Sequence, residues 1–363
     1  MLADDKRRRE VGPRCCRPNI PVPSSLFIDA NHIALHRASS CDVAWRWPSG
    51  HRLLSRIRMA DGERMVPNTP LSLQDERQPH ELRVVIGPAV VGLRCGDGEF
   101  ARMVQTWCGV FRTDADPDYW LEIDLHDGRG AAEIQQVMPL LRVHARDGWF
   151  ASDPPLWEAE YRPSRRCLRF RSERDLFHPT IQPRYLNILL SSLYNSYWED
   201  QGNVPRGAFL VHGCGVLIGN RGYLFTGPSG AGKTTVARLS QAYAVLNDEV
   251  VLLALREGSV EMAGTPLLGG LNRRSAQAVP LKTVLLLRHD DEPALREVAA
   301  REAYTRFLAQ IFDLAPVLSS GTDRLRWLSE RMDFARGVLE RAPCYELAFR
   351  PDDSFWPLLQ ALP

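Results

Sequence analysis

A glycine-rich run in the second half of the chain contains the residues best suited to chemistry. A glycine is followed by four residues and then by Gly-Lys-Thr, which is the pattern of a phosphate-binding P-loop. The glycines let successive backbone N–H groups curl around an anion without clashes from Cβ atoms. Lys233 would reach the β- and γ-phosphates of a nucleotide, and the Thr234 hydroxyl would bind Mg²⁺. The predicted phosphate-binding residues are Gly227, Pro228, Ser229, Gly230, Ala231, Gly232, Lys233, Thr234 and Thr235.

The flanks of this run and the composition of the chain support the interpretation. Residues 222–226 have the pattern of a short buried strand, and residues 235–239 that of the first turns of a helix, whose unpaired N–H groups would face the anion. Lys6, Lys233 and Lys282 are the only lysines among 45 basic residues. A lysine inside the loop is therefore an unusual choice in this chain, and its compact, mobile ammonium suits a phosphate. The alternative is a Gly/Ser-rich turn that fits the pattern by chance.

Two further segments carry groups that could assist a reaction at the loop. His212 ends a predicted strand and precedes a glycine, which would allow close approach of the backbone. Asp248 and Glu249 follow the predicted buried strand 242–246, at the carboxyl end where ligands bind in open α/β sheets. A carboxylate there could hold Mg²⁺ through a water or accept the proton of an attacking hydroxyl. The alternatives are a structural histidine and solvated turn acids.

Arg273 and Arg274 end a glycine-rich segment, residues 261–274, that the sequence predicts to be a mobile loop. Their guanidinium groups could close on a transferred phosphate as an arginine clamp. The alternative is a surface loop whose arginines face water, and the sequence leaves both open. The acidic run that follows His289 contains metal-ligand types, but we interpret it as a charged turn.

Composition and charge exclude several classes of protein. The net charge is +1 and 25% of the residues are charged. The sequence therefore shows neither the excess of basic residues typical of nucleic-acid-binding proteins nor an acidic tail. The longest apolar runs, such as residues 250–255, are too short to span a bilayer, and the charged segment 1–10 does not resemble a secretory signal. The 8 cysteines form no Cys-x-x-Cys pair, which favours scattered reduced thiols. We therefore expect a cytoplasmic protein that binds neither nucleic acid nor membrane.

The organisation of the chain predicts two domains, for which 363 residues are sufficient. Residues 1–25 are rich in Arg and Pro and predict a flexible arm. Residues 26–180 predict a strand-rich α+β domain of unknown role, with a helix over 100–111. Residues 181–363 begin with an amphipathic helix and continue as an α/β domain that contains the P-loop and a helix over 294–312.

Four motifs in the second half occur in an order that resembles a known family. They are Val-His-Gly at 211–213, the P-loop at 227–235, Asn-Asp-Glu at 247–249 and Gly-Thr-Pro at 264–266. Over residues 205–363 the chain resembles the catalytic domain of HPr kinase/phosphorylase and its wider set of HPr-kinase-like proteins. The resemblance implies an α/β P-loop domain related to phosphoenolpyruvate carboxykinase. It also implies Mg²⁺-dependent phosphoryl transfer from ATP to a serine hydroxyl.

The resemblance also implies roles for individual residues. Lys233 would bind the phosphates, and Thr234 would bind the metal. Asp248 falls on the first acid of the family's Asp-Asp pair, which implies a general base that also lies at the metal. Glu249 replaces the second acid of that pair and receives a metal-linked or positioning role. His212 falls on the histidine that helps to form the active site.

The chain also departs from this family in ways that limit the functional prediction. The family's later Glu-x-Arg-Gly segment is absent, and the N-terminal half does not resemble the family's regulatory domain, so the protein HPr is not implied as the substrate. We expect an ATP- and Mg²⁺-dependent kinase that phosphorylates a serine or other hydroxyl of a protein or peptide. The alternatives are a nucleotide-binding regulatory or scaffold module without transfer activity and a small-molecule phosphotransferase of the carboxykinase type. The sequence leaves open the acceptor, ATP or pyrophosphate as donor, reverse dephosphorylation and homo-oligomer formation.

Overall fold

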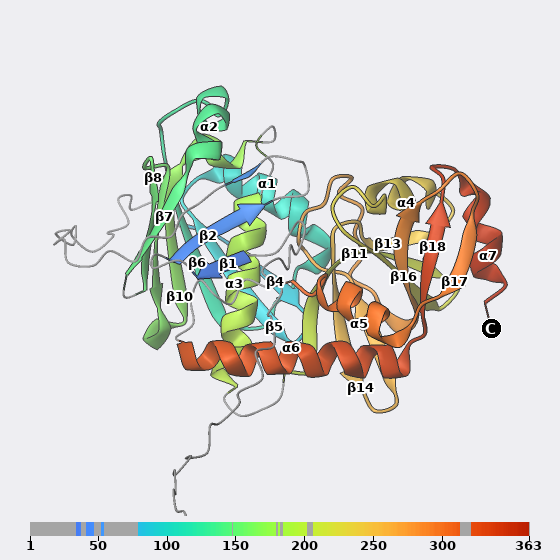
Figure 1. Cartoon of the computed structure of the whole chain (residues 1–363). Helices are drawn as coiled ribbons and strands as arrows, with labels where there is room; N and C mark the ends of the chain where they lie inside the picture. Colours follow the sequence, from blue (N-terminus) through green and yellow to red (C-terminus); the bar gives the residue numbers. More distant parts are fainter. Residues whose placement is uncertain are drawn as a thin grey trace, which may run out of the picture.

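The structure is a computed structural model, and it shows a mixed α/β fold with two large sheets (Figure 1). It describes residues 34–37, 41–46, 52–53, 79–146, 148–178, 181, 184–201, 206–312 and 321–362. The predicted flexible arm, residues 1–25, lies outside the described residues. Strands β1 (Ala34–Arg37), β2 (Cys41–Arg46) and β3 (Arg52–Leu53) form a small antiparallel sheet.

The first large sheet has 7 strands in the order β4-β5-β6-β10-β9-β8-β7. They are β4 (His80–Ile86), β5 (Ala89–Cys95), β6 (Tyr119–His126), β7 (Arg142–Arg146), β8 (Trp149–Asp153), β9 (Trp157–Arg162) and β10 (Cys167–Glu173). Strand β6 pairs in parallel with β5 and with β10, and the other pairs are antiparallel. Helix α1 (Gly98–Cys108) begins where Asp97 accepts a hydrogen bond from the Phe100 N–H, which confirms the helix predicted over 100–111 to within a few residues.

Helix α3 (Arg184–Asp200) packs one apolar face against this sheet. Leu186, Leu190 and Leu193 are completely buried, at the spacing by which a helix presents one side to a core. The same hydrophobic cluster includes Leu252 and Leu267 from the second half of the chain. One core therefore extends from the first sheet across α3 into the second half, and the domain boundary near residue 180 stays a prediction.

The second large sheet closes on itself through a ring of strands. Its strands are β11 (Ala208–Ile218), β12 (Arg221–Thr226), β13 (Ala244–Asn247), β14 (Val250–Arg256), β15 (Ser259–Ala263), β16 (Ala278–His289), β17 (Ala294–Glu297) and β18 (Cys344–Phe349). Strand β12 pairs with β11 on one side and with β16 on the other, which completes the ring β11-β14-β15-β16-β12. Strand β13 pairs with β11, and β18 joins β16 to β17.

Parallel pairing brings three strand ends to one edge of this sheet. The register pairs Thr226 with Leu286 and His289 with Phe349, so the carboxyl ends of β12, β16 and β18 lie side by side. The P-loop leaves β12 directly after Thr226. The fold therefore places the loop next to the last residues of β16 and β18.

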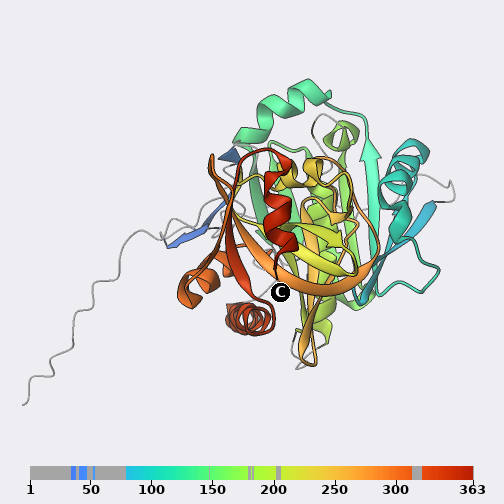
Figure 2. The same ribbon diagram turned by 90° about the vertical axis from the view of Figure 1, so that its right-hand side faces the viewer.

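Helices cover the two sides of the ring (Figure 2). Helix α4 (Lys233–Leu239) follows the P-loop, and α7 (Trp356–Gln360) packs near it at the C-terminus. The long helix α6 (Gly321–Arg341) contacts β11, β14 and β15 and runs along one side of the second half, beside α5 (Ala300–Leu308). Among the described residues, no helix is both long and apolar enough to cross a membrane.

The segment predicted as one helix over 294–312 is instead a strand followed by a helix. Strand β17 pairs antiparallel with β18, and only then does α5 begin. The prediction of a continuous helix was wrong because pairing with an edge strand decided the conformation of the first residues, which local periodicity does not reveal.

Candidate functional site

The P-loop connects β12 to α4 and has the backbone conformation of a tightly curled loop. Gly230 and Gly232 have φ angles of 81° and 103°, which residues with a side chain rarely adopt. A Cβ on Gly232 would lie 2.4 Å from Cζ of Phe349, the last residue of β18. The predicted strand and helix flank the loop as expected. Both its conformation and its close contact with β18 therefore require glycine.

Lys233 lies under this loop with its ammonium held by the loop itself. Its Nζ donates hydrogen bonds to the carbonyl oxygens of Gly227 and Pro228, at 2.8 Å and 2.9 Å. The residue is 6% exposed, and burial lowers the pKa of the amine to about 8, an effect that the nearby charge of Glu249 opposes. Among the residues that the structure describes, the hydrogen bonds of this buried cation go to neutral carbonyl groups.

His212 and Glu249 lie together, and both are close enough to Lys233 for their charges to interact. The Nε2 atom of His212 lies 3.5 Å from Oε1 of Glu249. The His212 side chain is buried, whereas the Glu249 side chain keeps 17% of its surface exposed. Burial and the charge of Lys233 lower the pKa of His212, and Glu249 and the side chain of Gln310 oppose this shift. The fold thus brings together three of the predicted site residues, with Glu249 as the carboxylate that reaches solvent.

Asp248 points into a different environment from Glu249. It is completely buried, and its two carboxylate oxygens accept hydrogen bonds from the N–H groups of Leu271 (2.6 Å) and Arg273 (3.1 Å). A Cβ on Gly269 would lie 2.5 Å from its carboxylate, so the backbone closes over it. Burial raises the pKa of Asp248 although the two amides stabilise its charge. Asp248 as general base and metal ligand stays a prediction, and in the structure its oxygens anchor a neighbouring segment.

That segment, residues 264–274, is called the strap below. Asn247 holds its beginning: Nδ2 donates to the carbonyl oxygens of Thr265 (3.0 Å) and Leu267 (2.8 Å). The Oδ1 atom of Asn247 accepts from the N–H groups of Glu249 and Val250. The Asn-Asp pair thus fixes the strap to the turn between β13 and β14, and the predicted mobile loop is extensively hydrogen-bonded.

The guanidinium groups of the two arginines of the strap bond to backbone carbonyls. The guanidinium of Arg273 donates to carbonyl oxygens at the end of α4 and in the turn beyond it, a favourable place for a cation. Its acceptors are Ala237, Ser240 and Tyr243. The guanidinium of Arg274 donates to the carbonyl oxygen of Pro266 within the strap, at 3.1 Å. The phosphate clamp stays a prediction, and in the structure both guanidinium groups bond to backbone carbonyls.

The donors at this site suit Mg²⁺ only in combination with a nucleotide. Mg²⁺ prefers oxygen ligands and in phosphate sites keeps several waters. Thr234 follows Lys233 in the first turn of α4, and its hydroxyl is the protein oxygen that the P-loop pattern supplies. Within the described part of the chain, no three His, Cys, Asp or Glu side chains converge to hold a metal ion. Thr234, phosphate oxygens and water therefore fit the metal, whereas a separate protein cage does not.

Sequence reasoning missed two residues that contact the predicted site. His289, at the end of β16, is exposed, and its Nε2 lies 2.8 Å from the carbonyl oxygen of Gly230. Its ring stacks on Phe349 with centroids 5.5 Å apart. Gln310 accepts the backbone N–H of His212 at its carbonyl oxygen, and its side chain faces the imidazole. The position of His289 follows from the pairing of β16 with β12, which the sequence alone does not specify.

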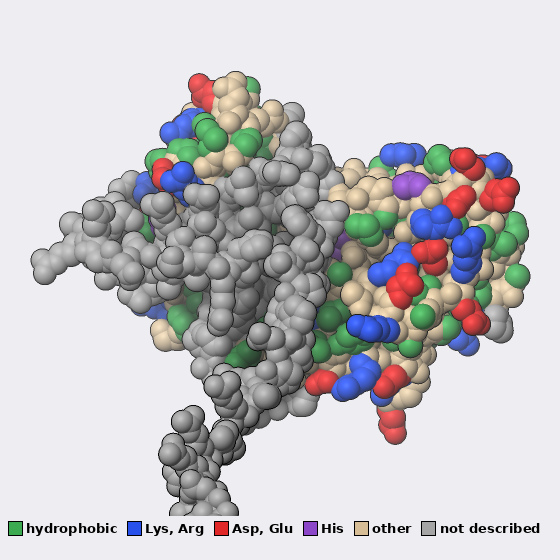
Figure 3. Space-filling model, viewed as in Figure 1, with side chains coloured by type: hydrophobic (Ala, Val, Ile, Leu, Met, Phe, Trp, Pro, Cys, Tyr) green, Lys and Arg blue, Asp and Glu red, His purple; other side chains and the backbone are tan. Residues whose placement is uncertain are grey.

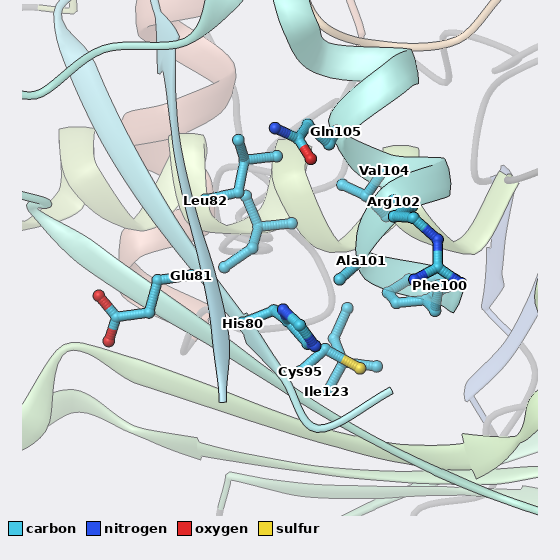
Figure 4. Close-up of a pocket in the computed structure, with 11 residues that line it drawn as sticks. His80, Glu81, Leu82, Cys95, Phe100, Ala101, Arg102, Val104, Gln105 and Ile123 are labelled. Atoms are coloured by element: carbon cyan, nitrogen blue, oxygen red, sulfur yellow. The ribbon is translucent and has the colours of Figure 1, made fainter. Parts of the chain in front are cut away.

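A small cavity lies elsewhere, between α1 and the strands β4, β5 and β6 (Figure 4). Its volume is about 120 Å³. The side chains of Leu82, Val104 and Ile123 form its apolar part, and those of His80 and Arg102 contribute polar groups. No residue of the P-loop or of the strap lines it. We therefore place the candidate functional site at the P-loop, where the chemical groups converge.

On the face of the second half seen in Figure 3, acidic and basic side chains are mixed, and no large patch of one charge is visible. This agrees with the net charge of +1. The function is inferred from the residues of the chain, because no family model matches it and no curated protein matches it.

Proposed function

We propose that the chain is an ATP- and Mg²⁺-dependent phosphotransferase that phosphorylates a serine or other hydroxyl of a protein or peptide. The observation that carries the proposal is the convergence of Lys233 with the pair formed by His212 and Glu249. Structural ion-pair networks also bury charges, but here the buried ammonium lies inside a glycine-rich loop with the P-loop pattern. A cation, a phosphate cradle and an accessible carboxylate are the parts that phosphoryl transfer requires.

Lys233 and the loop backbone would bind the nucleotide. The ammonium exchanges the carbonyl oxygens of Gly227 and Pro228 for the β- and γ-phosphate oxygens, which carry full charges and make stronger hydrogen bonds. The glycines expose backbone N–H groups to the same phosphates. Mg²⁺ held by Thr234 and the phosphates supplies neutralisation of the charge on the transferred group.

Glu249 takes the role of general base in this proposal. An acceptor hydroxyl oxygen forms a bond to the γ-phosphorus, the bond from phosphorus to the β–γ bridging oxygen breaks, and ADP leaves with the bond's electrons. Glu249 accepts the hydroxyl proton because its carboxylate is partly exposed, in contrast to the enclosed Asp248. His212 lies behind Glu249 and positions its carboxylate.

A nucleotide-binding module without transfer activity is the second candidate. The observation in its favour is that Asp248, one of the two adjacent acids, is used for anchoring the strap, which leaves one carboxylate for chemistry. Such a module would bind ATP and transfer nothing. The carboxykinase-type alternative has no observation of its own among the described residues.

The test combines nucleotide binding with phosphate transfer from γ-labelled ATP to serine-containing peptides and to water, with pyrophosphate as a second donor. Lys233→Met should lose nucleotide binding. Glu249→Gln should bind ADP as the wild type does but transfer phosphate about 100-fold more slowly. Failure of the wild type to bind ATP would refute the proposal, as would equal transfer by wild type and Glu249→Gln. ATP binding without any transfer would favour the non-catalytic module.

A further inference from the structure

The strap is attached to three parts of the molecule at once. Asp248 accepts hydrogen bonds from its backbone, Arg273 connects it to the end of α4, and Leu268 connects it to α3. The first two attachments lie within the P-loop half of the chain. The third comes from the helix that packs against the first sheet. The strap is therefore a physical link between α3, which packs against the first sheet, and the predicted nucleotide site.

Asn187 is the residue of α3 that binds the strap, and it does so through two hydrogen bonds. Its Nδ2 donates to the carbonyl oxygen of Leu268 at 2.9 Å, and its Oδ1 accepts the N–H of the same residue at 2.8 Å. Two bonds to the N–H and the C=O of one residue fix the orientation of the backbone at Leu268 as well as its position. Asn187 is only 3% exposed, so loss of either bond would leave a buried polar group unpaired, at a substantial cost.

The residues after Leu268 lie between Asp248 and the P-loop helix. The backbone of Gly269 closes over the Asp248 carboxylate, as described above. At Gly270 a Cβ would lie 3.7 Å from Cγ2 of Thr234, so the strap and the Thr234 side chain are in close proximity. Displacement of the strap would therefore alter the packing around the residue whose hydroxyl the P-loop pattern assigns to the metal.

We propose that Asn187 is a positioning residue for the nucleotide site: through Leu268 and the strap it holds the side chain of Thr234 in the orientation that binds a Mg²⁺–nucleotide complex. This inference rests on the proposed nucleotide binding at the P-loop. It makes the affinity for the metal–nucleotide complex dependent on α3, and hence on the first sheet, which contributes no residue to the P-loop.

The test uses the full chain and two matched asparagines of α3. Asn187→Asp replaces the donor to the Leu268 carbonyl by an oxygen that repels it. Asn195→Asp is the control, because Asn195 is also buried in α3 (7% exposed) but accepts a hydrogen bond from Arg206 at 3.1 Å. ADP affinity is measured by calorimetry with Mg²⁺ and again with EDTA. Hydrogen exchange of the strap amides reports directly on the attachment of the strap.

Asn187→Asp should weaken Mg²⁺·ADP binding about 10-fold while changing metal-free ADP binding less than about twofold, and it should speed exchange in the strap. Asn195→Asp should change neither affinity. Gly269→Ala, which forces the strap away from Asp248 and leaves α3 intact, should reproduce the metal-selective loss and serves if Asn187→Asp does not fold.

Equal losses with and without Mg²⁺, or unchanged affinity in both strap variants, would overturn this inference while nucleotide binding by the wild type stands. Absence of ADP binding in the wild type would overturn the proposed function and this inference with it.

Discussion

The ammonium of Lys233 is buried and loses hydrating water on folding. Its hydrogen bonds go to the carbonyl oxygens of Gly227 and Pro228, and Glu249 attracts its charge from nearby. These contacts compensate only part of the desolvation, so the pKa falls from the ordinary 10.5 to about 8. A phosphate chain would supply the missing negative charge. The lysine is therefore explained by function more readily than by stability.

Replacing this lysine should separate stability from binding. Lys233→Met should raise the free energy of unfolding at pH 7 by about 1–3 kcal/mol, because it removes a buried charge, and should abolish ADP binding. Below pH 8 the lysine is charged in both the folded and the unfolded state, so its burial lowers the free energy of unfolding by the full amount. This loss of stability decreases between pH 8 and the ordinary pKa of 10.5, where the folded-state lysine is neutral. The stability gap between variant and wild type, measured by denaturant unfolding, should therefore narrow over that range. A gap that is constant from pH 7 to 10, or a less stable variant, would contradict this account.

Asp248 and Glu249 show what the sequence could and could not predict about the site. The P-loop pattern is local, so its residues and flanks could be identified directly from their spacing. The side chains of adjacent residues point in different directions, so the environments of these two acids depend on segments that are distant in the sequence. Asp248 is enclosed because the strap, more than 15 residues further on, folds over it. For this reason the sequence could not predict that Asp248 is enclosed while the Glu249 side chain stays partly exposed.

Helix α4 depends on its surroundings for stability. It has 7 residues, which is too short for a helix to be stable on its own. Its buried residues Val236 and Ala237 pack into the core, and the guanidinium of Arg273 binds the carbonyl oxygens at its C-terminal end. The helix that begins at Lys233 is thus held at its far end by the strap, which places the lysine and the threonine beside it.

Replacing Arg273 should distinguish a helix cap from a phosphate clamp. Arg273→Leu should lower the free energy of unfolding by about 1–3 kcal/mol, because several carbonyl groups lose their donor. Arg238→Leu, an exposed arginine of the same helix, is the control and should change stability by less than about 0.5 kcal/mol. Denaturant unfolding and the transfer rate under saturating ATP are the two measurements. Unchanged stability with a large loss of transfer rate would restore the clamp interpretation.

The elements themselves were predictable where the pattern is local and strong. Strands around the P-loop and helix α1 follow from their apolar spacing. Strand β17 was not predictable, because its conformation comes from pairing with β18, and the position of His289 beside Gly230 comes from pairing of β16 with β12. Such pairings join residues separated by about 50 positions or more, and single-sequence periodicity contains no information about them.

At the scale of the whole molecule, the two halves share a hydrophobic core. The cluster around α3 contains residues of the first sheet together with Leu210, Leu252 and Leu267 of the second half. Gly87, in the turn between β4 and β5, approaches β14 so closely that a Cβ would lie 2.3 Å from a methyl carbon of Leu252. A continuous core of this kind couples the stability of both halves.

Substitution of Gly87 should therefore weaken the molecule as one unit. Gly87→Ala strains a residue with a φ of 58° and crowds Leu252, and should lower the free energy of unfolding by about 1–3 kcal/mol. Gly258→Ala is the control, with a φ of 70° but open space at its Cβ, and should cost less. Tryptophan fluorescence and circular dichroism should show one coincident transition in both variants. Two separate transitions would show that the halves unfold independently.

The hydrogen bonds of Lys233 to the carbonyl oxygens of its own loop have a consequence for the rate of nucleotide binding. The loop is curled around the ammonium of Lys233, so if a nucleotide binds as proposed, the backbone is in place and only the lysine side chain has to move. The association rate would then be set by the diffusional encounter of protein and nucleotide, and not by a conformational change of the protein. Differences in affinity among nucleotides would accordingly appear in their dissociation rates.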